Sequence, residues 1–357
     1  MKHHSKISFC TVAMNRIHHV QSTLIKNMND NAGNTGEVEF VLLDYNSTDG
    51  LEHWIKNNCT KYIETGILKY YKTAHPKYFD RSHSRNMAFK LATGDIICNV
   101  DADNFLGEDF AGYVREEFTK DSNIFITANN RQKDTIGRVC VKKNDFYKVK
   151  GYNEEFEGYG FEDFEFYERL KNQNLKPVSF SQEKFLNVIN HSDDERLAND
   201  FKSLNIWKLF ISYIKPTCSE LMFLYKNKKI EIGVLIDEVI EGVNIFGAID
   251  KNKTSSLGDW AEGGWKQDNN KFIFSMAGSI ETSTSVLNKD TFSYQNKLFH
   301  EVTDGALIGE IQYLSSGIKN RNKLNSSRVN PGIIINQNGF GQGNVSENFG
   351  KHFFYIA

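Results

Sequence analysis

The chain has 357 residues, a formal net charge of −2 at pH 7, 39% hydrophobic residues and 25% charged residues. This length exceeds the usual size of a single hydrophobic core, so we expect two domains. The composition is that of a soluble globular protein, and no apolar stretch approaches the roughly 18 residues of a membrane span. The near-neutral charge argues against sequence-independent binding to nucleic acid, and we expect no nucleic-acid partner.

The cellular compartment is predicted from the first residues and from the cysteines. Residues 1–16 run into a strand-like segment without the apolar centre of a signal peptide. The cysteines are scattered and form no C-x-x-C pair: Cys10, Cys59, Cys98, Cys140 and Cys218. Dispersed, buried thiols are typical of a reducing compartment. We therefore expect a cytoplasmic protein.

The first 215 residues alternate between strand and helix patterns. Strands are predicted at 7–14, 38–45, 67–73, 95–100, 123–129, 138–149 and 185–190, and helices at 16–28, 51–58, 82–93, 108–119 and from about 162. Several strands are apolar at nearly every position, which is typical of strands buried on both faces. Together with the intervening helices, this favours an α/β fold with a mostly parallel, doubly wound sheet.

The sequence changes character near residue 216. Ser192 and Glu195 fit a capping box, which predicts a long helix to about Ile214. Its segment "NIWKLFISYIK" is amphipathic, which favours packing between domains, with attachment to the inner face of a membrane as the alternative. Beyond it lie short strand-like pieces at 229–236, 244–249, 271–278 and 331–336. We predict an α/β domain at 1–216 and a smaller β-rich domain at 217–357.

Two acids follow the strand at 95–100. Asp101 and Asp103 lie two positions apart, so in extended geometry their side chains face the same way. Open α/β sheets bind ligands beyond the carboxyl ends of their strands. Two carboxylates at that place suit Mg²⁺ or Mn²⁺, which in turn binds a diphosphate. A pair of solvated turn acids is the alternative.

The order of several segments resembles a GT-A-fold glycosyltransferase of the family 2 type. They are "TVAMNR", "DYNSTDG", "RSHSRNMAFKLATGDIICNVDAD", "GYNEEFEGYGFEDFEFYERL" and a late "NH". The block "GYGFEDFEFYERL" is similar to galactosyltransferases, polypeptide GalNAc-transferases and bacterial chondroitin-type polymerases. The resemblance covers about residues 7–214. It implies a Rossmann-like GT-A fold and metal-dependent, inverting transfer of a hexose or N-acetylhexosamine from a UDP-sugar.

The same resemblance implies a set of residues that bind the sugar nucleotide. They are Thr11, Ala13, Arg16, Asp44, Ser47, Arg81, Arg85, Asn86 and Asp101. For Asp44, a carboxylate at a strand end can accept hydrogen bonds from a nucleoside. Arginines near a helix start favour phosphate. The alternatives are a helix start for Arg16, a turn or helix cap for Ser47 and an ion pair with Asp80 for Arg81.

The resemblance also implies the metal ligands and the catalytic acids. Asp101, Asp103 and His191 are the expected ligands, and the imidazole favours Mn²⁺ over Mg²⁺. Asp163 is the expected base that removes a proton from the acceptor hydroxyl, while Glu162 hydrogen-bonds to hydroxyls. The alternatives are two acids that complement a helix dipole and a structural histidine.

Other functions stay open at this point. A nucleotidyltransferase also uses strand-end aspartates, although residues 11–20 contain no glycine for its phosphate loop. A carbohydrate-binding or scaffold protein without activity is the other alternative. The favoured donors are UDP-Gal and UDP-GalNAc, and the expected acceptor is a glycan or lipid-linked glycan of a bacterial surface polysaccharide or lipooligosaccharide. The β-rich domain is expected either to bind the acceptor, with Trp260 and Trp265 stacking on sugars, or to serve packing and assembly. The segment Gly339–Gly350 is predicted to be a plain glycine-rich loop.

Overall fold

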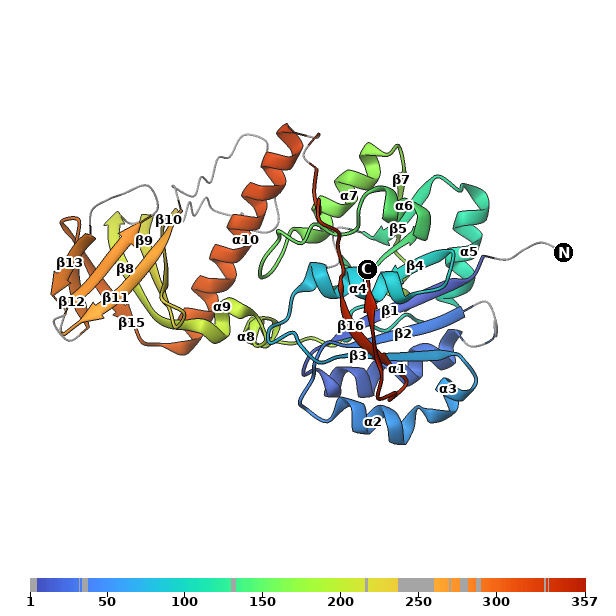
Figure 1. The fold of residues 1–357 in the computed structure, drawn as a ribbon. Helices are drawn as coiled ribbons and strands as arrows, with labels where there is room; N and C mark the ends of the chain where they lie inside the picture. Colours follow the sequence, from blue (N-terminus) through green and yellow to red (C-terminus); the bar gives the residue numbers. More distant parts are fainter. Residues whose placement is uncertain are drawn as a thin grey trace. The chain divides into compact units, whose positions relative to one another are not determined.

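The computed structural model describes residues 5–31, 33, 38–129, 133–215, 218–236, 260–269, 271–276, 282–286, 290–330, 332 and 334–357. The chain forms two compact units, one of residues 1–192 and 320–357 and one of residues 193–319 (Figure 1). This division differs from the predicted boundary at residue 216. The last part of the chain returns to the first unit because its two strands join the sheet there.

The first unit is built on a nine-stranded sheet with the order β17-β16-β3-β2-β1-β4-β6-β5-β7. Its strands are β1 (Ile7–Ala13), β2 (Val38–Asp44), β3 (Leu68–Thr73), β4 (Ile96–Asn99), β5 (Ile124–Ala128), β6 (Val139–Lys142), β7 (Lys176–Phe180), β16 (Gly343–Glu347) and β17 (Phe353–Ile356). The central strands β3, β2, β1 and β4 are parallel, and so are β5 and β7. Strand β6 is antiparallel to β4 and β5, and β16 is antiparallel to β3 and β17.

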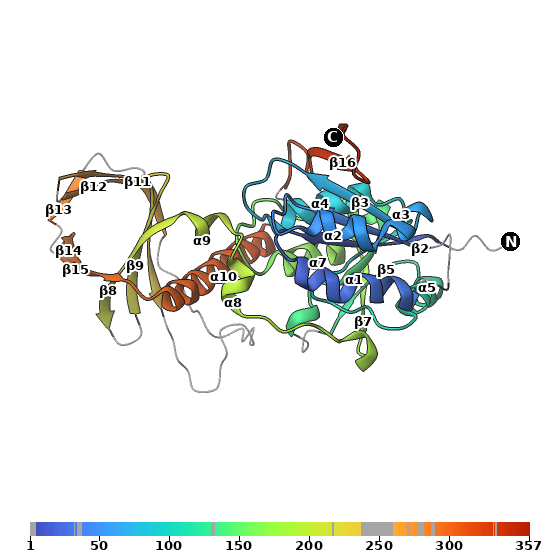
Figure 2. The ribbon, with the colours of Figure 1, turned by 90° about the horizontal axis from the view of Figure 1, so that it is seen from below.

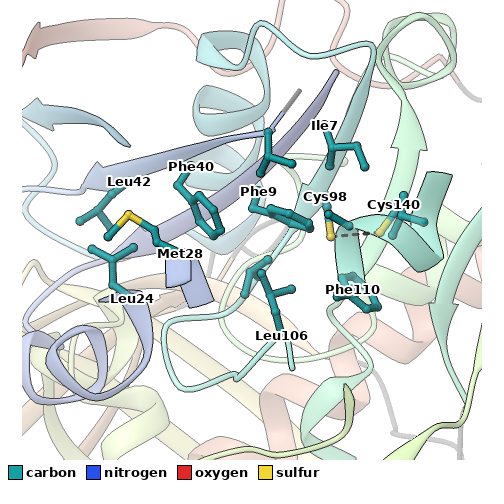
Figure 3. Packing of buried hydrophobic residues seen from close by; sticks show 14 of the residues in the cluster. Ile7, Phe9, Leu24, Met28, Phe40, Leu42, Cys98, Leu106, Phe110 and Cys140 are labelled. Carbon is teal, nitrogen blue, oxygen red and sulfur yellow. Dashed lines mark hydrogen bonds between the residues drawn. The ribbon is translucent and has the colours of Figure 1, made fainter. Parts of the chain in front are cut away.

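Helices cover both faces of this sheet (Figure 2). They are α1 (Ile17–Asn31), α2 (Leu51–Asn58), α3 (Thr60–Glu64), α4 (Arg81–Leu91), α5 (Phe110–Lys120), α6 (Lys143–Lys148) and α7 (Glu162–Asn172). Neighbouring residues of β1 face opposite ways, so Phe9 packs with α1 and α5 while Cys10 packs with α4 and α7. Figure 3 shows the first of these cores, with Phe9, Phe40 and Phe110 among its side chains. The α/β prediction is confirmed.

Two predicted strands of this unit differ in the structure. Of the predicted strand at 138–149, only Val139–Lys142 is extended, and α6 follows at once. The segment 185–190 forms no strand of the sheet, and β7 at Lys176–Phe180 takes that place. Pro177 lies in β7, which tolerates it because β7 is an edge strand and need not donate every ladder hydrogen bond.

The second unit contains an eight-stranded sheet with the order β13-β12-β11-β10-β9-β8-β15-β14. The strands are β8 (Ile206–Lys215), β9 (Cys218–Tyr225), β10 (Lys229–Ile236), β11 (Ala261–Asp268), β12 (Lys271–Met276), β13 (Thr282–Val286), β14 (Thr291–Tyr294) and β15 (Lys297–Val302). All its pairs among the described residues are antiparallel. The prediction of a separate β-rich region is confirmed.

The predicted helix at 192–214 is wrong for most of its length. Helix α8 (Asp193–Leu197) ends early, α9 (Phe201–Asn205) is short, and Ile206–Lys215 is strand β8. Leu209 and Phe210 are both fully buried but belong to two different hydrophobic clusters. Consecutive residues that point to opposite faces are characteristic of a strand, and pairing with β9 and β15 outweighs the helical spacing of the apolar residues.

The long helix α10 (Gly305–Val329) is the main element that the sequence analysis missed. In the second unit Ile308 and Ile311 of α10 pack in the cluster that contains Leu209 and Phe223. The predicted strand at 244–249 lies outside the described residues. The described residues of the predicted strand at 331–336, namely 332 and 334–336, belong to no strand.

Two further expectations concern the tryptophans of the second unit and contact with a membrane. Trp265 is only 5% exposed and belongs to the aromatic core of the second unit, and Lys319 lies 4.0 Å over the half-buried ring of Trp260. Both positions fit packing better than stacking on a sugar. Among the described residues, every helix is too short or too polar to serve as a membrane span.

Candidate active site

The site lies where the central parallel strands end. Ala13, the last residue of β1, is the register partner of Asp44, the last residue of β2. On the other side of β1, the backbone N–H of Val100 donates to the carbonyl of Cys10 at 2.8 Å, and Asp101 follows directly. The chain therefore places Asp44 and Asp101 at the same edge of the sheet, where open α/β folds bind ligands.

Asp103 and His191 form one pair at this edge. Nε2 of His191 lies 2.7 Å from Oδ2 of Asp103, and both side chains are about nine-tenths buried. The second oxygen of Asp103, Oδ1, accepts from the Asn104 amide at 2.9 Å. Nδ1 of His191 lies 3.4 Å from the Ser192 carbonyl, which is the kind of partner that orients a metal-binding imidazole. A carboxylate oxygen and an imidazole nitrogen that meet in this way fit a Mn²⁺ ion.

A short backbone pairing brings the two residues together. Asn104 and Val188 form an isolated antiparallel bridge. The N–H of Ile189 donates to the Asp103 carbonyl at 2.9 Å, and the N–H of Phe105 donates to the Asn187 carbonyl at 3.0 Å. His191 lies two positions after Ile189, and this places its ring against Asp103.

Arg138 holds this pairing in place, and the sequence analysis missed it. The side chain is fully buried. Its Nη2 donates to Oδ1 of Asn104 at 2.8 Å and to the Phe105 carbonyl at 2.9 Å, and Nη1 donates to the Phe185 carbonyl. Burial lowers the pKa of Arg138 from its ordinary value. A single arginine before an apolar strand carries no motif, so no sequence signal identifies it.

Arg85 joins three carboxylates in a second cluster. Its Nη1 donates to Asp163 at 3.0 Å and to Glu162 at 3.2 Å, and its Nη2 donates to Asp101 at 3.0 Å. The Arg85 side chain is only 7% exposed. The guanidinium offsets part of the negative charge, which leaves more carboxylates than cations at this position.

The carboxylates in this cluster differ in acidity. Burial is the largest cause that raises the pKa of Asp163; Arg85 lowers the pKa and the charges of Glu162 and Asp101 raise it, and together these effects bring it to about 7. For Asp101 burial also acts to raise the pKa, but the charge of Arg85 and the hydrogen bonds from Asn99 and Arg85 outweigh it and hold the pKa below its ordinary value. A carboxylate that titrates near neutral pH is suited to proton transfer.

Asp44 is fully buried at the end of β2. Its Oδ2 accepts from the Tyr70 hydroxyl at 2.7 Å, and its Oδ1 accepts from the N–H of Ser47 at 2.7 Å. Burial raises its pKa, although these hydrogen bonds and the charge of Lys72 act against the rise. The structure thus brings Asp44, Ser47 and Ala13 together, and the Ser47 hydroxyl lies 3.4 Å from the Ala13 carbonyl.

Several predicted nucleotide-binding residues are engaged with the protein itself. The Asn86 amide donates to the Tyr152 carbonyl and to Glu154, both at 2.9 Å, and its Oδ1 accepts from the N–H of Tyr152 at 2.7 Å. Nη1 of Arg81 donates to the Gly158 carbonyl at 2.7 Å. Their roles toward a nucleotide stay predictions.

Three further predicted positions lie in different surroundings. Arg16 precedes α1, and its carbonyl accepts the N–H of His19 and of Val20 at 3.1 Å, as the helix-start alternative predicts. Thr11 is buried within β1. Asp101 lies on Arg85 and Asn99, and the paired atoms of Asp103 and His191 are not among its contacts. The predicted role of Asp101 as a metal ligand stays a prediction.

The segment Gly339–Gly350 packs against Glu154 and Asn86. The N–H of Gly341 donates to Oε1 of Glu154 at 2.6 Å. Gly341 has φ of +56°, and a Cβ there would lie 2.7 Å from the backbone of Asn86. The segment also contains β16, so the prediction of a plain loop is only partly correct.

Comparison with known proteins gives one match at the level of sequence families. Residues 129–192 match the family described as "N-terminal domain of galactosyltransferase". The matched stretch contains Arg138, Glu162, Asp163 and His191. It is therefore similar to a glycosyltransferase domain over the part of the chain that supplies the acid pair and the histidine. A search of curated proteins gives no match.

Solved structures with some similarity include glycosyltransferases. The mannosyltransferase PcManGT from Pyrobaculum calidifontis, in complex with GDP-Man and Mn²⁺, has 14% identity and a TM-score of 0.44, with 51% of this chain and 56% of that chain covered. TarS from S. aureus has 15% identity and a TM-score of 0.43, with 54% and 61% covered. Drosophila β1,4-galactosyltransferase 7, in complex with manganese, UDP-Gal and xylobiose, has 14% identity and a TM-score of 0.39, with 55% and 75% covered. The chain spans less than two thirds of the first two.

Proposed function

We propose that this protein is a metal-dependent, inverting glycosyltransferase that transfers a sugar from a UDP-sugar to a glycan acceptor. The observation that carries the proposal is the pairing of Asp103 with His191 at the same sheet edge as the Arg85-bound acids. The family match over residues 129–192 supports it, because that stretch contains the acid pair and the histidine. Galactose and N-acetylgalactosamine are the favoured donor sugars.

In this proposal the strand ends bind the donor. Asp103 and His191 would hold the divalent ion, with Mn²⁺ favoured by the imidazole nitrogen. A bound ion supplies neutralising charge for the departing diphosphate. Asp44, held in place by Tyr70 and Ser47, accepts hydrogen bonds from the nucleoside.

Asp163 acts as the base for the acceptor. With a pKa near 7, it is partly ionised at neutral pH and can take the proton of the attacking hydroxyl. Arg85 keeps its carboxylate next to Glu162, which hydrogen-bonds to substrate hydroxyls. A single displacement by the activated hydroxyl inverts the configuration at the anomeric carbon.

The experiment is a panel of sugar nucleotides, including GDP-mannose, incubated with the full chain and Mn²⁺ with and without EDTA. We expect nucleoside diphosphate release from a UDP-sugar that EDTA abolishes. Release of pyrophosphate from a nucleoside triphosphate and a sugar phosphate would instead identify a nucleotidyltransferase. Binding of a glycan without any turnover would leave a carbohydrate-binding protein.

A further inference from the structure

The segment that leads into Glu162 and Asp163 has an unusual backbone. Gly158 has φ of +74°, Gly160 of +94° and Phe161 of +72°. The two glycines adopt this left-handed conformation readily, but Phe161 carries a Cβ and is strained in it. Strained residues persist only where their surroundings hold them. The backbone before Glu162 and Asp163 therefore needs contacts that hold it in this conformation.

Some of these contacts come from helix α10, which is far away in the sequence. Asn320 is 2% exposed, and its Nδ2 donates to the Glu157 carbonyl at 3.0 Å and to the Tyr159 carbonyl at 3.4 Å. Nζ of Lys323, one helical turn further on, donates to the Glu155 carbonyl. From Asn320 on, the helix belongs to the same compact unit as this segment.

Arg81 of α4 holds the same segment by a different contact. Its Nη1 donates to the Gly158 carbonyl at 2.7 Å, and its guanidinium lies 5.0 Å over the Tyr159 ring. The carbonyls of Glu157, Gly158 and Tyr159 are therefore all bound by side chains from α4 and α10. Consecutive carbonyls bound in this way restrict the backbone angles at Gly158 and just beyond.

We propose that Asn320 is a positioning residue for the transfer reaction: it holds residues 157–161 so that Glu162 and Asp163 face the acceptor. This inference rests on the proposed function. A single amide that binds two carbonyls on either side of Gly158 fixes the turn at that glycine. Its burial strengthens both hydrogen bonds, because water does not compete for them.

The proposed role of Asn320 predicts different effects on the donor and on the acceptor. In the proposed function Asp44, Asp103 and His191 bind the donor and the metal, and all three come from segments other than the turn at Gly158. The acceptor depends on it through the base. Loss of the Asn320 amide should therefore lower the efficiency toward the acceptor and leave donor binding unchanged.

The test compares Asn320→Ala with Asn322→Ala in the full chain. Asn322 lies on the same helix, is exposed and is the same residue type, so it matches the change in helix propensity. For Asn320→Ala we expect acceptor kcat/KM to fall about tenfold or more while donor KM and the Mn²⁺ requirement stay within about twofold, since two hydrogen bonds are lost. Asn322→Ala should behave like the unaltered protein.

Hydrogen exchange supplies a second measurement that does not need activity. In Asn320→Ala the amides of residues 155–161 should exchange about tenfold faster or more, while those of β1 and β4 stay unchanged, because local opening of the segment becomes easier. Lys323→Ala, which removes one contact from an exposed side chain, should change both readouts in the same direction but less. Lys323→Ala replaces Asn320→Ala in both measurements if Asn320→Ala does not fold.

The outcomes are distinct. If residues 155–161 exchange at the rate of the unaltered protein in both Asn320→Ala and Lys323→Ala, the inference is overturned. Faster exchange with an unchanged acceptor kcat/KM would also overturn it, because the segment would then not position the base. If the unaltered protein transfers no sugar, the proposed function fails, and the positioning role falls with it; the exchange measurement still shows whether Asn320 holds the segment.

Discussion

Nε2 of His191 lies 2.7 Å from Oδ2 of Asp103, although 88 positions separate the two residues in the chain. Neither residue lies on a regular helix or strand of the sheet. The contact depends on the backbone bridge between Asn104 and Val188 and on the buried guanidinium of Arg138. The metal site that we propose is therefore a property of two loops held together by one arginine.

Replacement of His191 should weaken metal binding. In His191→Ala we expect the Mn²⁺ concentration for half-maximal nucleotide release to rise about tenfold or more, because a ligand nitrogen is lost. Calorimetric titration of the protein with Mn²⁺ gives the same comparison without substrate. His53→Ala, an exposed histidine on α2, is the control and should leave the requirement unchanged. An equal Mn²⁺ requirement in both variants would contradict the assignment.

Asp163→Asn should remove the base without removing the donor site. We expect kcat for transfer to fall about 10²- to 10⁴-fold, the usual contribution of a positioned base. The donor dissociation constant should stay within a few-fold, since Asp44 and Asp103 remain. Asp268→Asn, at an exposed position on β11, is the control. Turnover near that of the control would exclude Asp163 as the base.

The pH dependence follows from the pKa of Asp163, which burial raises to about 7. Because the base must be ionised, acceptor kcat/KM should rise with pH up to about 7 and then level off. The sign is opposite to that of an acid catalyst, for which activity falls as pH rises. Rates measured between pH 5.5 and 9 at saturating donor test this. A profile that is flat below pH 7 would argue against the ionisation of Asp163 as the controlling step.

Arg138→Gln should disturb both stability and the metal pair. The change leaves the Phe185 and Phe105 carbonyls without their charged donor, and we expect unfolding to become easier by about 3 kcal/mol. We also expect weaker binding of Mn²⁺, measured by calorimetry, because Asn104 and the loop beside Asp103 lose their anchor. Unchanged Mn²⁺ affinity in a destabilised variant would limit Arg138 to a structural role.

The strand β16 should be essential to the first unit although it lies near the end of the sequence. Val345 is fully buried, so Val345→Ala should lower the free energy of unfolding by about 2 kcal/mol. Val329→Ala is the matched control, since Val329 is 79% exposed, and it should change stability by less than about 0.5 kcal/mol. Urea unfolding of both variants measures the difference. Equal stability would show that β16 is not part of the cooperative core.

Much of the first unit was predictable because its signals are local. The apolar runs of β1, β2 and β4 have no alternative to burial, and the acids after β4 mark the ligand-binding edge. The side chains of Asp103 and His191 do meet, while their role as metal ligands stays a prediction. The partners of Arg85 and Asn86 were not predictable, because they come from elsewhere in the chain: Arg85 binds the first turn of α7, and Asn86 binds the backbone at Tyr152.

The sequence by itself determined the α/β class, the central strands and the residue types at the strand ends, since these follow from periodicity and from the chemistry of carboxylates. Only the tertiary structure decided that Ile206–Lys215 is a strand, that β16 returns to pair with β3, and that Asn320 binds the turn before Asp163. The physical reason is that each of these depends on a partner far away in the sequence. An amphipathic segment fits either a helix or a strand until its partner strand provides hydrogen bonds, and a buried amide shows its function only once the carbonyls it binds are in place.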